Sequence, residues 1–165
     1  MPSSFALKLI SKDSIPDSLK KAERYRLLGE PDEAESVCLD ILQVDPGNQE
    51  ALVDLVLAIS DQFRRERHPR VELALRYAGD LTDEYQRKYY KAVVLEREAG
   101  IHLDRGTPNA LILIRFAEAM DRYEEAAAIR PPGDDSAILR WNACVRAIRR
   151  QQLKPDMGKE EYMET

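Results

Sequence analysis

Apolar residues recur along most of the chain at intervals of three and four positions, which is the spacing of one face of an α-helix. The stretch from residue 31 to 45 shows it most clearly, because small and medium apolar side chains alternate there with acidic and polar ones. The apolar positions of this stretch are Ala34, Cys38, Ile41 and Leu42. Pro31 stands in the first turn and Pro46-Gly47 follows the last, so the pattern predicts a short helix with defined ends.

The same spacing predicts six further helices and no strand. The caps that begin the predicted helices are Ser14, Asn48, Thr82 or Asp83, Thr107-Pro108, and Asp134 or Asp135. The seven expected helices span about 14–28, 31–45, 48–64, 71–81, 83–105, 107–130 and 135–152. The run ALILI at residues 110–114 is the most strand-like segment, but it lies inside a long capped helical pattern. The fold class expected from the sequence is therefore all-α, with consecutive helices antiparallel.

The chain divides into three parts by composition. Residues 1–13 form an N-terminal lead-in whose apolar stretch 5–10 is a candidate docked segment. Residues 14–152 form one helical domain, in which residues 64–70 (RRERHPR) are a charged connector. Residues 153–165 are polar and are expected to be disordered.

One spacing occurs twice in the chain. In each copy an alanine is followed by side chains four and seven positions later and by a proline twelve positions later. The two copies are Ala34, Cys38, Ile41, Pro46 and Ala119, Tyr123, Ala126, Pro131. The alanine lets a neighbouring helix approach closely, and the next two side chains fill the gap between the helices. A helical hairpin of this kind cannot bury both faces alone, so such units stack.

Residues 15–62 resemble a tetratricopeptide repeat (TPR), and residues 115–150 resemble one more weakly. The residues that match the family pattern are Ala22, Tyr25, Gly29, Ala34, Ile41, Leu42 and Pro46. Ser18 and Lys21 depart from it, because the family usually has large apolar residues there. The resemblance implies a right-handed array of antiparallel helical hairpins, a TPR-like α-solenoid. The two copies are not separated by whole repeats of ~34 residues, so a stacked helix-pair protein with longer units stays an alternative.

TPR proteins mostly bind other proteins in a concave groove that is lined by the first helix of each pair. The resemblance implies these groove positions: Leu19, Glu23, Arg26, Val53, Leu57, Ser60, Tyr90, Val94, Arg97, Leu139, Ala143 and Arg146. An apolar floor edged by arginines suits a peptide or helix with hydrophobic anchors and acidic flanks. The alternative is that these arginines are ordinary solvated residues and the leucines belong to the core. Leu19, Glu23 and Asp54 occupy positions where one subclass has a lysine and asparagine clamp for a chaperone carboxylate, so that ligand is not expected.

Length and charge narrow the choice of partners. A chain of 165 residues usually folds as one domain, and a net charge of −5 disfavours general nucleic-acid binding. No stretch reaches the roughly 18 apolar residues of a membrane span, and the N-terminus lacks the pattern of a secretion signal. A cytoplasmic protein without membrane contact is the expectation.

Candidate chemistry is sparse. His68 and His102 are isolated from other ligand residues, and no glycine-rich phosphate loop is present. Cys38 and Cys144 fall on apolar helix faces, and Ser60 has no evident base. The sequence therefore predicts no enzyme activity, no metal and no cofactor.

The last predicted helix offers a second interpretation. Arg140, Arg146, Arg149 and Arg150 give it a basic character that would suit a nucleic-acid-associated or regulatory helical protein. The simpler explanation is a capping helix with a polar outer face. An unpaired end helix could also support a homodimer.

Overall fold

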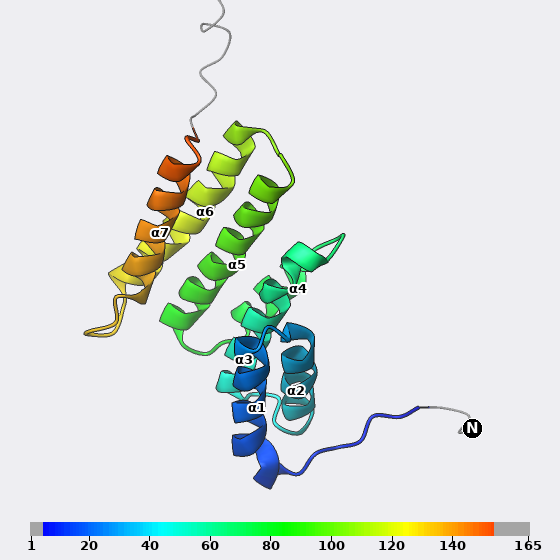
Figure 1. The fold of residues 1–165 in the computed structure, drawn as a ribbon. Helices are drawn as coiled ribbons and strands as arrows, with labels where there is room; N and C mark the ends of the chain where they lie inside the picture. The colour runs from blue at the N-terminus through cyan, green and yellow to red at the C-terminus, as the bar shows by residue number, and fades with distance from the viewer. Residues whose placement is uncertain (1–4, 154–165) are drawn as a thin grey trace, which may run out of the picture.

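The computed structural model describes residues 5–153 (Figure 1), and within them it contains α-helices and short 3-10 helices but no strand. The prediction of an all-α fold with seven α-helices is confirmed for this part of the chain. The helices are α1 (Ile15–Leu27), α2 (Pro31–Val44), α3 (Gln49–Asp61), α4 (Val71–Gly79), α5 (Glu84–Asp104), α6 (Asn109–Ala128) and α7 (Ser136–Arg150). The 3-10 helices are η1 (Lys12–Ser14) and η2 (Phe63–Arg65).

Two of the predicted caps are confirmed by side-chain hydrogen bonds. Asn48 Oδ1 accepts from the backbone N–H of Ala51 at 2.9 Å, and Asp83 Oδ2 accepts from that of Gln86 at 2.9 Å. Each bond satisfies one of the amides that the first turn of a helix leaves without a partner.

Ser14 is the N-cap residue of α1, as predicted, but its side chain caps no amide, and the cap predicted at Thr107 is wrong. The Ser14 hydroxyl donates backwards to the carbonyl of Ser11, because η1 precedes α1 and takes up that side chain. Thr107 lies outside α6, which begins at Asn109 with Pro108 as its flanking residue, and the Thr107 hydroxyl is 3.3 Å from His102 Nδ1. Gly29 and Gly106 have φ of +75° and +68°, so they allow the chain to leave α1 and α5 in a left-handed turn.

Each helix packs against the next one along the chain, and α1 also contacts α3, which in turn contacts α5. Figure 1 shows α5, α6 and α7 lying side by side at one end of the molecule, with α1 to α4 at the other end. The helix α5 belongs to both groups. Its residues Tyr85 and Val93 join a core cluster with α6 and α7, whereas Val94 and Ile101 join a second cluster with α2, α3 and α4.

The connector between α3 and α4 is held by packing and by ion pairs. Phe63 is buried in the second core cluster. Arg70 Nη1 donates to Glu35 Oε1 of α2 at 2.5 Å, and its Nε donates to Glu66 Oε2 at 2.7 Å. Burial raises the pKa of Glu35, but the hydrogen bonds from Arg70 and Gln62 and the charge of Arg70 outweigh it, so that pKa is lowered.

No helix in residues 5–153 has both the length and the apolar composition needed to cross a bilayer. Leu153, the last described residue, is buried against the cluster of α5, α6 and α7, and its N–H donates to the carbonyl of Ile148 at 3.1 Å. The disorder expected for the tail concerns residues that lie, apart from Leu153, outside the described part of the chain.

Candidate functional site

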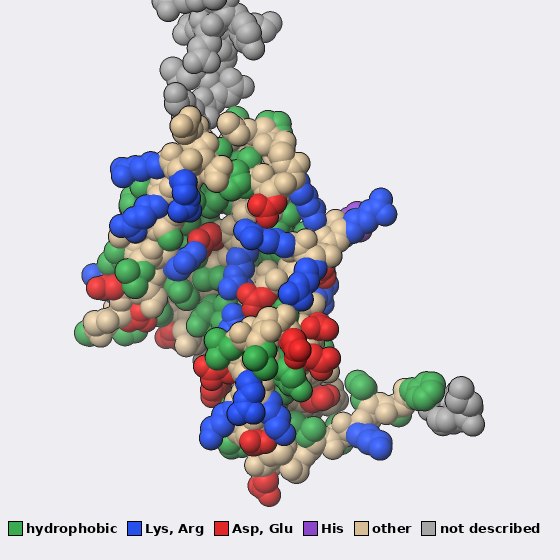
Figure 2. Space-filling view, in the orientation of Figure 1, with side chains coloured by type: hydrophobic (Ala, Val, Ile, Leu, Met, Phe, Trp, Pro, Cys, Tyr) green, Lys and Arg blue, Asp and Glu red, His purple; other side chains and the backbone are tan. Residues whose placement is uncertain are grey.

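A groove of about 650 Å³ opens between α3, α5 and α7, and α6 forms part of its floor. We call it the α3/α5/α7 groove. Its lining residues are Leu57, Ser60, Asp61, Phe63, Arg64, Tyr89, Tyr90, Val93, Glu96, Arg97, Gly100, Leu103, Phe116, Arg140, Ala147 and Arg150. Figure 2 shows hydrophobic side chains in the hollow between α5 and α7, and Lys and Arg side chains gathered over α7 and across the upper part of the same face.

The floor of the groove is apolar and aromatic. Tyr89 and Tyr90 follow one another on α5, with ring centroids 5.0 Å apart in an edge-to-face arrangement. Tyr89 also meets the buried ring of Tyr123 from α6 at 5.8 Å. Burial raises the pKa of Tyr89 and of Tyr90, so both hydroxyls stay neutral at physiological pH. Such rings offer apolar area and a hydroxyl to a ligand at little entropic cost.

One wall of the groove is organised around Asp61, the last residue of α3. Arg97 Nη1 of α5 lies 2.8 Å from Asp61 Oδ1, and Arg26 Nε of α1 lies 2.8 Å from Asp61 Oδ2. Arg97 Nη1 also donates to the carbonyl of Leu57 at 2.9 Å and to the hydroxyl of Ser60. Burial lowers the pKa of Arg97 while the Asp61 carboxylate opposes that change, and the guanidinium stays charged.

The opposite wall is organised around Glu96 of α5. Tyr123 donates its hydroxyl proton to Glu96 Oε2 at 2.6 Å, and Arg140 of α7 donates to both carboxylate oxygens. Burial, and then the neighbouring charge of Glu96, raise the pKa of Tyr123 far above its ordinary value. This arrangement ties α5, α6 and α7 together beside the aromatic floor.

The lining carries more positive than negative charge, although the whole chain has a net charge of −5. Four arginines and two carboxylates, Asp61 and Glu96, are among the lining residues. Arg97 and Arg140 contact these carboxylates, whereas Arg64 Nε lies 3.1 Å from Asp104 Oδ2. Arginine presents several donors in a planar fork that matches a carboxylate. The groove therefore favours a ligand that combines apolar groups with carboxylates.

Four of the residues that the sequence placed in a groove line this one, namely Leu57, Ser60, Tyr90 and Arg97. Arg26 does not line it but reaches its wall through Asp61. Leu19, Glu23 and Val53 are not among the lining residues either.

The remaining predicted positions lie elsewhere. Val94 is fully buried in the core, so it is not accessible to a ligand. On α7 the predicted positions Leu139, Ala143 and Arg146 are also not part of the lining, and Leu139 is 65% exposed. The groove uses instead the α7 face that carries the arginines at positions 140 and 150, with Ala147 between them. The phase assumed for α7 thus differs by about one residue from that of the structure.

Twelve of the sixteen lining residues were not among the predicted groove positions, including Asp61, Tyr89, Glu96 and Phe116. Tyr89 comes from α5 and Phe116 from α6, which was not among the helices expected to line a groove. The signal that could have found Asp61 and Glu96 is the presence of arginines two helices further along the chain, at Arg97 and Arg140, but only the fold shows that they meet.

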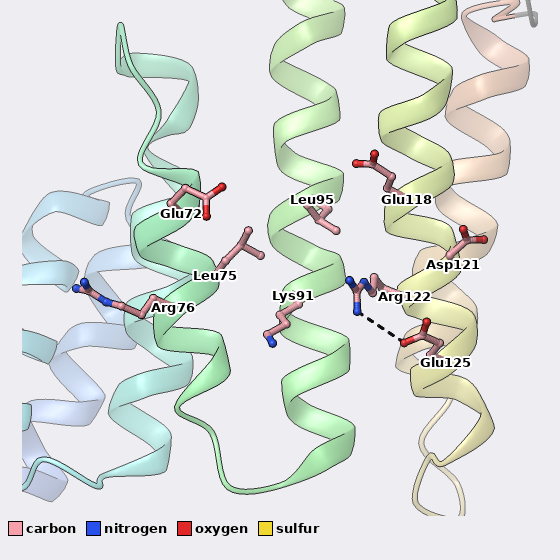
Figure 3. Close-up of a pocket in the computed structure, with 9 residues that line it drawn as sticks. All are labelled: Glu72, Leu75, Arg76, Lys91, Leu95, Glu118, Asp121, Arg122 and Glu125. Carbon is pink, nitrogen blue, oxygen red and sulfur yellow. Dashed lines mark ion pairs between the residues drawn. The ribbon is translucent and has the colours of Figure 1, made fainter.

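A second cavity of about 730 Å³ lies between α4 and α6, over α5 (Figure 3). Its lining residues are Glu72, Leu75, Arg76, Lys91, Leu95, Glu118, Asp121, Arg122 and Glu125. Two of these side chains are apolar, and the charged ones carry both signs, with Arg122 and Glu125 3.9 Å apart. This cavity has neither an aromatic floor nor an excess of positive charge.

Within residues 5–153, no three His, Cys, Asp or Glu side chains come together as a metal site would require. Cys38 and Cys144 are fully buried and unpaired with each other. Burial raises the pKa of both thiols to about 12, which suppresses the reactive thiolate.

No family model, no curated protein and no solved structure matches this chain. The groove has to be interpreted from its own residues.

Proposed function

We propose that this chain is a non-enzymatic protein-interaction adaptor that binds a peptide or a helix with apolar anchors and acidic flanks in the α3/α5/α7 groove. The observation that carries the proposal is the combination, in one groove, of an aromatic floor and a majority of arginines among the charged lining residues. Pockets of this composition suit recognition and lack a placed nucleophile with its base.

We further propose that the helices form a TPR-like array of stacked antiparallel hairpins. In support, α1, α3 and α5 pack in succession, as the first helices of stacked pairs would. Ala22, Ala34, Ala119 and Ala126 are all fully buried, as expected for small residues at close helix contacts. The α3/α5/α7 groove then corresponds to part of the concave face of the array.

The groove offers enough apolar surface for a modest affinity. Full burial of one large apolar side chain is worth about 1.5–3 kcal/mol, and binding at micromolar Kd requires about 8 kcal/mol. Two or three anchors supply about 3–9 kcal/mol, from which the entropic cost of ordering a peptide is subtracted. Even with charge-assisted hydrogen bonds to arginine, the expected Kd therefore lies above the micromolar value. We expect a ligand of moderate affinity whose binding weakens with added salt.

Selection from a phage-displayed library of random 12-residue peptides on the immobilised chain tests this proposal. We expect the selected peptides to combine large apolar residues with Asp or Glu. Leu57→Glu, in the groove floor, should weaken binding of a synthetic selected peptide at least about tenfold. Leu75→Glu is the matched control, since Leu75 is also a half-buried leucine but lines the other cavity. Circular dichroism and urea denaturation establish that both variants fold.

Three outcomes would contradict the proposal. The selection could enrich no common peptide chemistry, or Leu75→Glu could weaken binding as much as Leu57→Glu does. Alternatively, an added oligonucleotide could displace the peptide with a steep dependence on salt concentration, which would favour nucleic-acid binding through the arginines of α7.

A further inference from the structure

We propose that residues 154–165 (KPDMGKEEYMET) bind in the α3/α5/α7 groove of their own chain and compete there with the external ligand. This inference rests on the proposed function, because it assigns an occupant to the same groove.

The described chain ends beside the groove. Arg150, the last residue of α7, lines it. The backbone then passes through Gln151 and Gln152 to Leu153, which is buried against α5, α6 and α7. Gln152 has φ of +52°, which turns the chain at the end of α7. The following residues therefore start next to one end of the groove.

Residues 154–165 are long enough to follow the groove. Twelve residues span at most about 40 Å when extended. The α7 wall between Arg140 and Arg150 covers ten residues of helix, which is about 15 Å. A segment that runs back along α7 can therefore reach from one end of this wall to the other, with several residues to spare.

The composition of this segment complements the groove. Its large apolar residues are Met157, Tyr162 and Met163, and its acidic residues are Asp156, Glu160, Glu161 and Glu164. Two lysines leave it with an excess of negative charge, opposite to the excess of arginine in the groove. Methionine suits an aromatic floor because its flexible thioether contacts aromatic rings favourably. The segment thus has the chemistry that we derived for the ligand from the groove alone.

The apolar N-terminal segment, residues 5–10, is a weaker candidate than residues 154–165 for the occupant of the α3/α5/α7 groove. Phe5, Leu7 and Leu9 are 88%, 91% and 73% exposed, so these apolar side chains are available to bind in a groove. However, the stretch from residue 5 to 10 carries a lysine and no carboxylate, so its charge has the same sign as that of the groove. It also leaves α1 at the end of the molecule away from α7 (Figure 1).

A groove that is occupied by the tail of its own chain has a lower apparent affinity for an external peptide. A segment linked to its own site has an effective concentration in the millimolar range for a short linker. An external peptide must displace it, so its apparent affinity falls by the fraction of chains in which the groove is open. Charge reversal in the segment should therefore increase the affinity of an external peptide, by about three- to tenfold if the groove is occupied most of the time.

Paramagnetic relaxation enhancement in the full chain tests the inference. A nitroxide on Met163→Cys is selective, since Cys38 and Cys144 are buried and their thiols have a raised pKa. We expect broadening of the amide signals of Leu57 and Tyr90 in the groove and none at Leu75 in the other cavity. Mixing ¹⁵N-labelled chain with unlabelled, spin-labelled chain separates binding within one molecule from binding to a second copy.

The control is a matched pair of charge reversals. Glu160→Lys/Glu161→Lys should abolish the broadening and strengthen binding of the selected phage peptide. Asp121→Lys/Glu124→Lys changes the net charge equally at exposed positions of α6 outside the α3/α5/α7 groove and should do neither. Broadening that occurs only in the mixed sample, or that survives Glu160→Lys/Glu161→Lys, would overturn the inference.

The two proposals can fail separately. If the selected peptide binds and Leu57→Glu weakens it, but the spin label broadens no groove amide, the tail does not occupy the groove and the proposed function stands. If the label broadens the groove amides but no peptide is selected, the groove serves the tail, and the proposed function fails. If neither occurs, both proposals are refuted.

Discussion

Asp54 is a half-buried acid on α3 whose charge destabilises the fold at neutral pH. Burial raises the pKa of its carboxyl from the ordinary 3.8 to about 6. Arg26 of α1 opposes the shift, while the negative charges of Glu50 and Glu23 add to it. Asp54 thus differs from Asp61, two helical turns further along α3, which is held by two arginines.

The size and sign of the effect follow from linkage between protonation and folding. A rise of about two pKa units corresponds to about 3 kcal/mol at most, and partial solvent contact reduces this to about 1–2 kcal/mol. Because the folded pKa lies above the unfolded one, the folded state binds the proton more tightly. The cost is therefore fully present above pH 6, and it disappears as the pH falls from 6 towards 4.

Asp54→Asn removes this charge while nearly keeping the shape of the side chain. We expect the free energy of unfolding to rise by about 1–2 kcal/mol at pH 7.5 and to be unchanged near pH 4. Urea denaturation followed by circular dichroism at both pH values measures the difference. Asp61→Asn is the control and should destabilise at pH 7.5, because it weakens two ion pairs at 2.8 Å.

An Asp54→Asn variant that is less stable than wild type at pH 7.5 would refute this reasoning. A gain of equal size at pH 7.5 and at pH 4 would also refute it, because the gain would then not come from removal of a charge.

Two further predictions concern the helix contacts. Arg70→Ala should lower the free energy of unfolding by about 1–3 kcal/mol at pH 7. The loss should become smaller when the pH falls through the lowered pKa of Glu35, and urea denaturation at pH 7 and pH 3 measures this difference. An equal loss at both pH values would contradict a contribution from the Arg70–Glu35 ion pair. Asn48→Ala should cost about 1 kcal/mol, since it removes the cap of α3, whereas Ser14→Ala should be nearly neutral because Ser14 caps no amide. Thermal unfolding of both variants measures the contrast, and similar losses would mean that the Asn48 bond contributes nothing specific.

The helices could be predicted from the sequence because their determinants are local. Apolar spacing, first-turn prolines and glycines after the last turn act within a few residues. They were sufficient to predict the seven α-helices that the structure contains in residues 5–153. The hydroxyls of Ser14 and Thr107 cap no helix amide because they have other local partners, the Ser11 carbonyl and the His102 ring. Competition between local hydrogen bonds of similar energy is not visible in a pattern of residue types.

The groove could be predicted only in part, because it depends on how helices are rotated against their neighbours. On α3 and α5 the apolar stripes placed Leu57, Tyr90 and Arg97 among residues that line the groove, whereas Val53 and Val94 do not line it. On α7 the residue types of Leu139 and Arg140 do not decide which of the two faces the groove. The choice is made by the contact of Arg140 with Glu96, a residue 44 positions away.

The charges that line the groove also hold its walls together, which limits how a ligand can use them. Asp61 and Glu96 join α1, α3, α5 and α7 through Arg26, Arg97 and Arg140, and Glu96 joins α6 through the hydroxyl of Tyr123. A ligand carboxylate must share these arginines with the internal carboxylates, and breaking a half-buried pair would cost stability. The ligand can instead use donors that the wall leaves over, because a guanidinium has five N–H groups. In the proposed function, selectivity for acidic flanks would therefore come from these remaining N–H donors, and the apolar floor would supply most of the affinity.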